Sequence, residues 1–165
     1  KERDGRVFGI DIGGTSVKWA VLGEDFSIRE RGSIPTDFST AEEAVSTLME
    51  IVEPYADRVR AIGVSAPGGI YEGDPDGVIH RGGALTYMDG CPVGRLLRER
   101  FDMPVAWTTT ASAALWASMP RAPARRLHGR CARDRTGIGG GIVVDGRVLR
   151  GANGFAGEFS FIRND

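Results

Sequence analysis

The stretch RVFGIDIGGTSVKWAVL, residues 6–22, places two short apolar segments on either side of a pair of glycines. Residues 6–12 and residues 16–22 each have the length and composition of a β-strand, and the second segment alternates as a half-buried strand does. Because only three residues separate the two segments, we expect a tight turn between them. This hairpin is the starting point of the fold prediction.

The rest of the chain predicts further strands and two helices. Strands are predicted at residues 26–34, 61–64, 104–106, 141–144 and 147–149, and helices at residues 40–55 and 93–101. Ser39 or Thr40 is expected to cap the first helix, and the chain must change direction at residues 65–69, SAPGG. Residues 70–80, rich in Gly, Pro and Asp, predict an exposed hairpin or loop. The order β-β-β-α-β indicates an α/β fold.

Composition limits the classes of function. A chain of 165 residues with 41% hydrophobic content can form one domain, or one domain and part of another. The net charge of −1 gives no basic surface for nucleic acid and no polybasic membrane patch. No apolar run reaches the roughly 20 residues that span a bilayer, and two cysteines do not make a disulfide framework. We therefore expect a cytoplasmic protein that binds small molecules.

The glycine pair lies in a motif that fits phosphate and metal binding. In Asp11-Ile12-Gly13-Gly14-Thr15, the glycines allow backbone amides to surround an anion, and Thr15 adds a hydroxyl donor. Asp11 can hold a magnesium ion or its waters. The alternative is an ordinary glycine hairpin beside a chance acid. A dinucleotide-binding site fits less well, because its glycines open a helix and this segment continues as a strand.

A second glycine cluster occurs late in the chain, at residues 136–141, TGIGGG, and it also leads into a strand. Alone, this cluster is a weak signal. Two such turns, one early and one late, suit a duplicated fold whose halves hold nucleotide phosphates from opposite sides of a cleft.

Four motifs together resemble the ROK family of ATP-dependent sugar kinases and sugar-sensing repressors. They are DIGGTSVK, GVSAPGGI, GGAL followed by a helix and PV, and TGIGGGIVVDGRVLRGANGFAGEFSFI, in the family's order and spacing. The resemblance covers nearly the whole chain except residues 107–135. It implies an actin-like ATPase (ribonuclease H-like) fold, with a complete N-terminal domain at residues 1–107 and the beginning of a truncated second domain at residues 108–165.

The resemblance also implies an activity and a set of site residues. Such a kinase transfers the γ-phosphoryl group of ATP, with magnesium, to a hydroxyl of a hexose or β-glucoside, and often forms a homodimer. Asp11 would contact magnesium indirectly, and Gly83, Ala84 and Glu158 would contact the sugar. The implied phosphate-binding residues are Gly13, Gly14, Thr15, Lys18, Thr136, Gly137, Gly139 and Gly140.

Two positions depart from the family pattern. The family's catalytic Asp aligns with Thr110, whose neutral hydroxyl is too weak a base at neutral pH, so the chain as written is predicted to be inactive. Phe161 stands where many members carry a zinc-binding His, so zinc is not expected. The alternatives are a non-catalytic sugar-sensing pseudokinase, a fragment of a ROK transcriptional regulator, and a nonfunctional fragment that holds neither ATP nor sugar because its cleft has one wall. Only ten residues precede Asp11, too few for a DNA-binding helix-turn-helix.

Residues 107–135 do not follow the expected pattern of elements. Residues 121–135, RAPARRLHGRCARDR, contain six Arg and one Leu, which predicts a solvated loop or insert in place of an apolar strand before Thr136. If the codons are read from the third base of the Ala106 codon, the bases at the Trp107–Thr108 junction can encode only Asp. The next two codons in this frame can encode Asn and Asp. A shifted frame over residues 128–135 permits an apolar strand ending in Gly. We hypothesise that this stretch is out of frame through single-base omissions.

Sequencing the DNA that encodes residues 100–140 tests the frame hypothesis. We expect an in-frame Asn-Asp pair after residue 106 and an apolar strand before Gly137, because both lie in the shifted frames. Confirmed threonine codons at positions 108–110 would contradict the hypothesis. They would also exclude catalysis by the family mechanism, because no base would be present.

Overall fold

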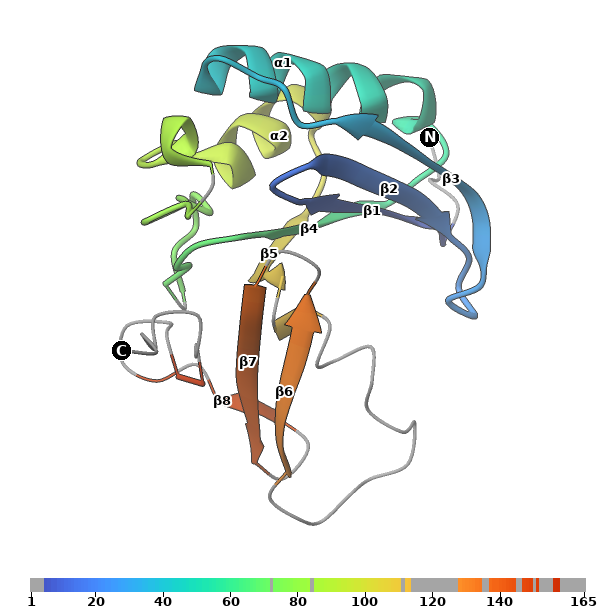
Figure 1. Cartoon of the computed structure of the whole chain (residues 1–165). Helices are drawn as coiled ribbons and strands as arrows, with labels where there is room; N and C mark the ends of the chain where they lie inside the picture. The colour runs from blue at the N-terminus through green and yellow to red at the C-terminus, as the bar shows by residue number, and fades with distance from the viewer. Residues whose placement is uncertain are drawn as a thin grey trace.

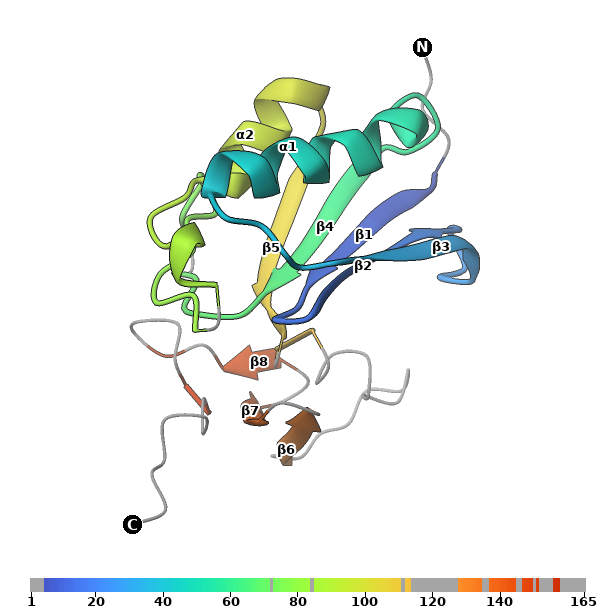
Figure 2. The same cartoon turned by 45° about the horizontal axis from the view of Figure 1, so that its top comes forward.

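The computed structural model describes residues 5–71, 73–83, 85–110, 112–113, 128–134, 137–144, 147–149, 151 and 156–157. A five-stranded sheet carries two helices on one face, and a three-stranded sheet lies beyond the end of β5 (Figures 1 and 2). The larger sheet contains β1 (Val7–Ile12), β2 (Ser16–Leu22), β3 (Ile28–Pro35), β4 (Ala61–Ala66) and β5 (Val105–Thr109). The helices are α1 (Ala41–Val52) and α2 (Val93–Phe101), with short 3-10 helices at Glu53–Tyr55 and Thr86–Met88. The smaller sheet contains β6 (His128–Asp134), β7 (Gly137–Val144) and β8 (Arg147–Leu149).

The strand order in the larger sheet is β3-β2-β1-β4-β5. β2 pairs antiparallel with both β1 and β3, whereas β4 pairs parallel with both β1 and β5. Because β1, β4 and β5 are parallel, their carboxyl ends meet at one edge of the sheet. The turn after β1, which carries the first glycine motif, therefore lies at the same edge as the ends of β4 and β5.

The alternating pattern of β1 decides which face of the sheet is buried. Phe8, Ile10 and Ile12 are all at most 3% exposed and belong to the core cluster. The helices complete that core with buried residues such as Leu48 of α1 and Leu97 of α2. Figure 2 shows both helices on this one face. The other residues of β1 consequently point to a face without α1 or α2.

The first helix begins as the sequence predicts. The Thr40 side chain accepts a hydrogen bond from the Glu43 amide at 3.2 Å, which confirms Thr40 as the N-cap. The Glu43 carboxylate in turn accepts a bond from the Ser39 amide at 2.8 Å. These reciprocal bonds satisfy amides that the first helical turn leaves without backbone partners. They fix where the chain leaves β3 and crosses over the sheet.

The stretch 107–135, for which the sequence predicts no strand, contains strand residues at both ends, so the predicted loop at residues 121–135 is wrong for residues 128–134. Residues 107–109 continue β5 and pair with residues 64–66 of β4. Residues 128–134, HGRCARD, form β6 and pair along their length with β7. β6 is an edge strand joined to β7 by a two-residue connection, so backbone hydrogen bonds can form there without an apolar face.

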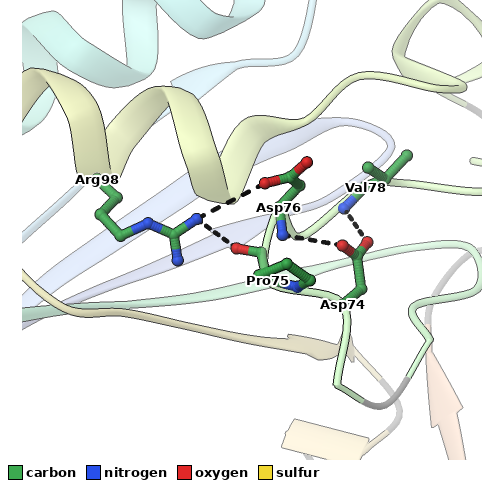
Figure 3. Close-up of polar contacts among 5 residues, drawn as sticks. All are labelled: Asp74, Pro75, Asp76, Val78 and Arg98. Atoms are coloured by element: carbon green, nitrogen blue, oxygen red, sulfur yellow. Dashed lines mark hydrogen bonds and ion pairs between the residues drawn. The ribbon is translucent and has the colours of Figure 1, made fainter.

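The loop at residues 70–80 is less exposed than predicted. Ile70 and Ile79 are buried, and Gly69 pairs antiparallel with His80, so only the middle of the loop is open to solvent. Figure 3 shows how Asp74 organises this middle part: its carboxylate accepts hydrogen bonds from the amides of Asp76 and Val78, both at 2.8 Å. Arg98 of α2 donates to the carbonyl of Pro75 and lies 4.0 Å from the Asp76 carboxylate. The loop is thereby fixed to α2.

Asp74→Asn tests the contribution of this carboxylate to stability. Burial opposes its charge, but the amide hydrogen bonds from Val78 and Asp76 prevail and lower the pKa of Asp74 below its ordinary value. The Asp74 carboxylate therefore stabilises the fold fully at pH values above its pKa in the unfolded chain, about 3.9. This stabilisation is lost as the pH falls through its lower pKa in the folded chain. Urea unfolding at pH 7 should show a loss of about 1 kcal/mol in the variant.

Urea unfolding at acidic pH separates the effect of the Asp74 charge from the effect of its packing. Near pH 3 the deficit of Asp74→Asn should shrink, because the carboxylate of the wild-type chain then begins to take up a proton. Asp76→Asn is the matched control: its ion pair with Arg98 is exposed, so we expect a change below about 0.5 kcal/mol. A deficit that is constant across the pH range would contradict the role of the Asp74 charge.

Candidate functional site

The first glycine motif forms a tight turn between β1 and β2. The amide of Gly13 donates to the carbonyl of Ser16 at 3.0 Å, which closes the turn over Gly14 and Thr15. A β-carbon on Gly13 would lie 2.9 Å from that Ser16 oxygen, so this position has no room for a side chain. The backbone amides of the turn are thus able to approach a bound group closely.

Thr36, just after β3, holds the turn from the neighbouring strand. Its hydroxyl donates to the carbonyl of Gly13 at 2.8 Å, and its amide donates to the carbonyl of Thr15 at 3.1 Å. No local pattern in the sequence points to Thr36, because its partners are more than twenty residues away along the chain. The turn therefore has a fixed shape before any ligand binds.

The strand register brings a row of polar side chains to the face opposite the helices. Asp11 of β1 pairs with Lys18 of β2 and with Ser65 of β4. Since paired residues on neighbouring strands share a face, the complete row is Ser33, Lys18, Asp11, Ser65 and Thr108. Within this row the Ser65 hydroxyl donates to Asp11 Oδ1 at 2.6 Å. Lys18 places a positive charge on the other side of the same carboxylate.

Apart from Arg31 at its end, the next row on this face contains almost no side-chain volume. It consists of Arg31, Ala20, Gly9, Gly63 and Ala106. A β-carbon at Gly63 would contact nothing within 4 Å. The two rows together line a hollow of about 800 Å³, which is within the size range of small-molecule sites. Of the predicted site residues, Asp11 and Lys18 line the hollow.

The turn after β4 lies against the segment predicted to contact a sugar. Gly68 has φ +98°, and a β-carbon there would lie 2.7 Å from the carbonyl oxygen of His80 and 3.1 Å from Gly82. Gly83 follows at φ +60°, with its amide donating to the carbonyl of Arg81 at 2.7 Å. Gly83 is therefore held beside the end of β4, the strand that neighbours β1 in the sheet. Ala84 lies outside the described residues.

β5 leads directly into the expected catalytic position. The Thr109 hydroxyl accepts a bond from the Ser112 amide at 3.2 Å and donates to the Ser112 hydroxyl at 2.9 Å, as a helix N-cap does. Thr110 follows immediately, at the edge that also holds the turn after β1. Its hydroxyl is buried and has no hydrogen-bond partner among the described residues. A neutral threonine hydroxyl at this position is too weak to act as a base at neutral pH.

The second glycine motif is described only in part. Gly137 begins β7 and pairs with Asp134 of β6, and Gly139 and Gly140 continue the strand. Gly157 lies so close to β7 that a β-carbon would be 2.8 Å from the backbone of Gly141. Arg135, Thr136, Glu158 and Phe161 fall outside the described residues. No cluster of potential metal ligands and no helix able to cross a membrane occurs within the described part of the chain.

The comparison with protein families gives one match across the chain. The model of the ROK family matches residues 7–164. The N-acetylmannosamine kinase of Citrobacter koseri is 32% identical over 151 residues, which is 90% of this chain and 51% of that protein. The chain thus spans about half the length of the curated relatives it matches.

Two solved structures are similar over nearly the whole chain. The ROK hexokinase from Thermus thermophilus superimposes with a TM-score of 0.74 at 31% identity, covering 93% of this chain and 51% of that one. A ROK family glucokinase from Streptomyces griseus, in complex with glucose and AMPPNP, gives a TM-score of 0.78 at 26% identity, covering 96% and 51%. The predicted actin-like ATPase fold of class α/β is confirmed.

Thr36→Val tests whether the turn after β1 depends on its clamp. Valine keeps the shape and removes the bond to Gly13, so the free energy of unfolding should fall by about 1 kcal/mol and amide exchange at residues 13–16 should accelerate. Thr47→Val, which removes a 2.9 Å bond to the Glu43 carbonyl within α1, is the control. Faster exchange of the turn in both variants, or in neither, would contradict the clamp.

Proposed function

We propose, since the chain belongs to the ROK family, that it forms the N-terminal part of an ATP-dependent kinase that phosphorylates a hydroxyl of a hexose-type sugar. The observation that carries this proposal is the closed Gly13–Thr15 turn beside Asp11, at the sheet edge where β4 and β5 also end. An anion at the turn and a metal at the carboxylate would be adjacent, which is the arrangement that a nucleotide phosphate requires.

Each residue of the proposed site has a role that follows from its chemistry. The amides of Gly14 and Thr15 would bind phosphate oxygens, Gly13 would shape the turn through the bond of its own amide to Ser16, and Lys18 would add a positive charge. A carboxylate is a ligand type that magnesium prefers, so Asp11 fits a magnesium ion or its waters. When bound, magnesium would neutralise charge on the transferred phosphate. The second phosphate motif would be formed by Thr136, Gly137, Gly139 and Gly140, and the sugar contacts by Gly83, Ala84 and Glu158.

The division into domains is part of the same proposal. We assign residues 1–107 to the first domain and residues 108–165 to the beginning of the second, with the ligand cleft between them. The presence of two separate sheets supports this assignment, although β5 extends two residues past the boundary, to Thr109. A cytoplasmic homodimer is the assembly proposed from the family resemblance.

The acceptor is proposed to be a hexose or hexose derivative. The relatives include an N-acetylmannosamine kinase, a hexokinase and a glucokinase, so this class is supported more strongly than a single sugar. The β-glucosides that the family resemblance also implies are hexose derivatives and belong to the same class. N-acetylmannosamine and glucose are therefore the first sugars to test.

Thr110 favours a second candidate function, a non-catalytic sugar-binding protein. Catalysis by a general base contributes roughly 10²–10⁴ to the rate, and a threonine hydroxyl supplies none of it at neutral pH. The chain as written would then bind sugar and nucleotide without turnover.

Calorimetry of Mg·ADP binding tests the proposed phosphate site. The 165-residue chain should bind Mg·ADP, and Asp11→Asn should weaken binding about tenfold or more, because it removes the charge that faces the metal. Asp25→Asn, at the exposed tip of the β2–β3 hairpin, is the matched control and should bind as the wild-type chain does. Absence of binding, or equal weakening in both variants, would overturn the proposed function.

Turnover distinguishes the two candidate functions. With ATP and either sugar, the chain as written should show no rate above the buffer background, because its base position is neutral. Thr110→Asp should raise the rate about a hundredfold or more if the chain retains the remaining kinase machinery. Binding of sugar without turnover in both proteins would favour the sugar-binding candidate, and turnover by the wild-type chain would refute Thr110 as the base position.

A further inference from the structure

Ser65 is the only polar residue in the buried class among the described residues, with 8% of its surface exposed. It lies in β4 beside Val64 and Ala66, both of which belong to the hydrophobic core. A buried hydroxyl without a hydrogen-bond partner would destabilise the folded state. Ser65 avoids this cost through its bond to Asp11 Oδ1 at 2.6 Å. Ser65 therefore stays beside Asp11 for two reasons: the hydrogen bond itself is favourable, and a buried hydroxyl without this bond would be unfavourable.

The length of this bond fits a hydroxyl that donates to a carboxylate. Hydroxyl-to-carboxylate bonds of about 2.5–2.7 Å are shorter and stronger than bonds between neutral groups. Because Oδ1 of Asp11 accepts this bond, Oδ2 is the oxygen that is positioned to receive a further donor or a metal-bound water. The hydrogen bond thereby restricts the rotation of the Asp11 carboxylate.

A second neighbour competes for the same carboxylate. Lys18 pairs with Asp11 from β2, while Ser65 pairs with it from β4, so the two residues lie on opposite sides of Asp11 in one row. An ammonium group attracts a carboxylate over a longer range than a hydroxyl does. Without the bond to Ser65, the Asp11 side chain would be free to turn toward Lys18. The carboxylate and the ammonium group would then pair with each other instead of binding a ligand.

We propose that Ser65 is a positioning residue, which holds the Asp11 carboxylate in the orientation that binds the metal of a metal–nucleotide complex. The inference rests on the proposed function, because that function assigns Asp11 to magnesium. Ser65 has no direct contact with the nucleotide in this role. It acts through Asp11 alone, so its effect should appear only when a metal is present.

Binding of Mn²⁺·ADP, measured by electron paramagnetic resonance on the 165-residue chain, tests the proposal. Ser65→Ala should weaken binding about threefold to tenfold, which corresponds to the loss of one hydrogen bond. Ser65→Thr restores a hydroxyl and should bind within about twofold of the wild-type chain. Binding of ADP in the presence of a chelator should be the same in all three proteins, because Asp11 then holds no metal.

A double-mutant cycle with Asp11→Asn identifies the route of the effect. Once Asp11 is replaced, Ser65→Ala should cause no further loss, because the carboxylate that it orients is gone. If Ser65→Ala does not fold, Ser65→Cys, which is nearly the same size and a weaker donor, replaces it and should weaken Mn²⁺·ADP binding in the same direction.

The outcomes separate this proposal from the proposed function. Wild-type affinity in Ser65→Ala, or equal weakening with and without metal, overturns the positioning role and leaves the phosphate site intact. Failure of the wild-type chain to bind Mn²⁺·ADP, or unchanged binding in Asp11→Asn, overturns the proposed function and the role of Ser65 with it.

Discussion

The position of β1 between an antiparallel and a parallel neighbour is the constraint on which the rest of the structure depends. β2 returns through the tight turn at Gly13, and β4 arrives in parallel after α1 has crossed the sheet. This arrangement places the end of β1, its turn and the ends of β4 and β5 at one edge. It also puts Asp11 between Lys18 and Ser65. The site is thus a consequence of strand pairing.

The two faces of the larger sheet serve different purposes because the side chains of β1 alternate. Phe8, Ile10 and Ile12 bury the face under the helices, and this core supplies the free energy that keeps the strands in register. The opposite face carries the polar row and the glycine row, which contribute little burial and leave a hollow. A one-residue slip of β1 would exchange these faces, so the core protects the geometry of the site.

The parts of the fold that could be predicted from the sequence are those with local causes. The hairpin of β1 and β2 follows from alternation and a glycine turn, and α1 from its spacing and the Thr40 cap. Ser65 and Thr36 were missed because their partners lie 54 and 23 residues away, and a lone hydroxyl in an apolar strand was the only local sign of Ser65. β6 was missed because pairing with β7 needs no apolar pattern at an edge.

The polar atoms at the end of β5 bear on the origin of residues 107–135. Four buried side-chain polar atoms lack hydrogen-bond partners among the described residues, and three of them belong to Trp107, Thr108 and Thr110. Adapted sequences satisfy nearly all such groups, and each exception costs about 1–3 kcal/mol. A ligand in the hollow could satisfy Trp107 and Thr108, which both line it, but Thr110 does not line the hollow. Backbone hydrogen bonds to β4 hold β5 in the sheet and do not depend on which side chains β5 carries. The sheet can therefore form with side chains that do not suit the site. Three of the four polar atoms without a partner among the described residues thus lie where the shifted frame begins, which is the position that the frame hypothesis predicts for them.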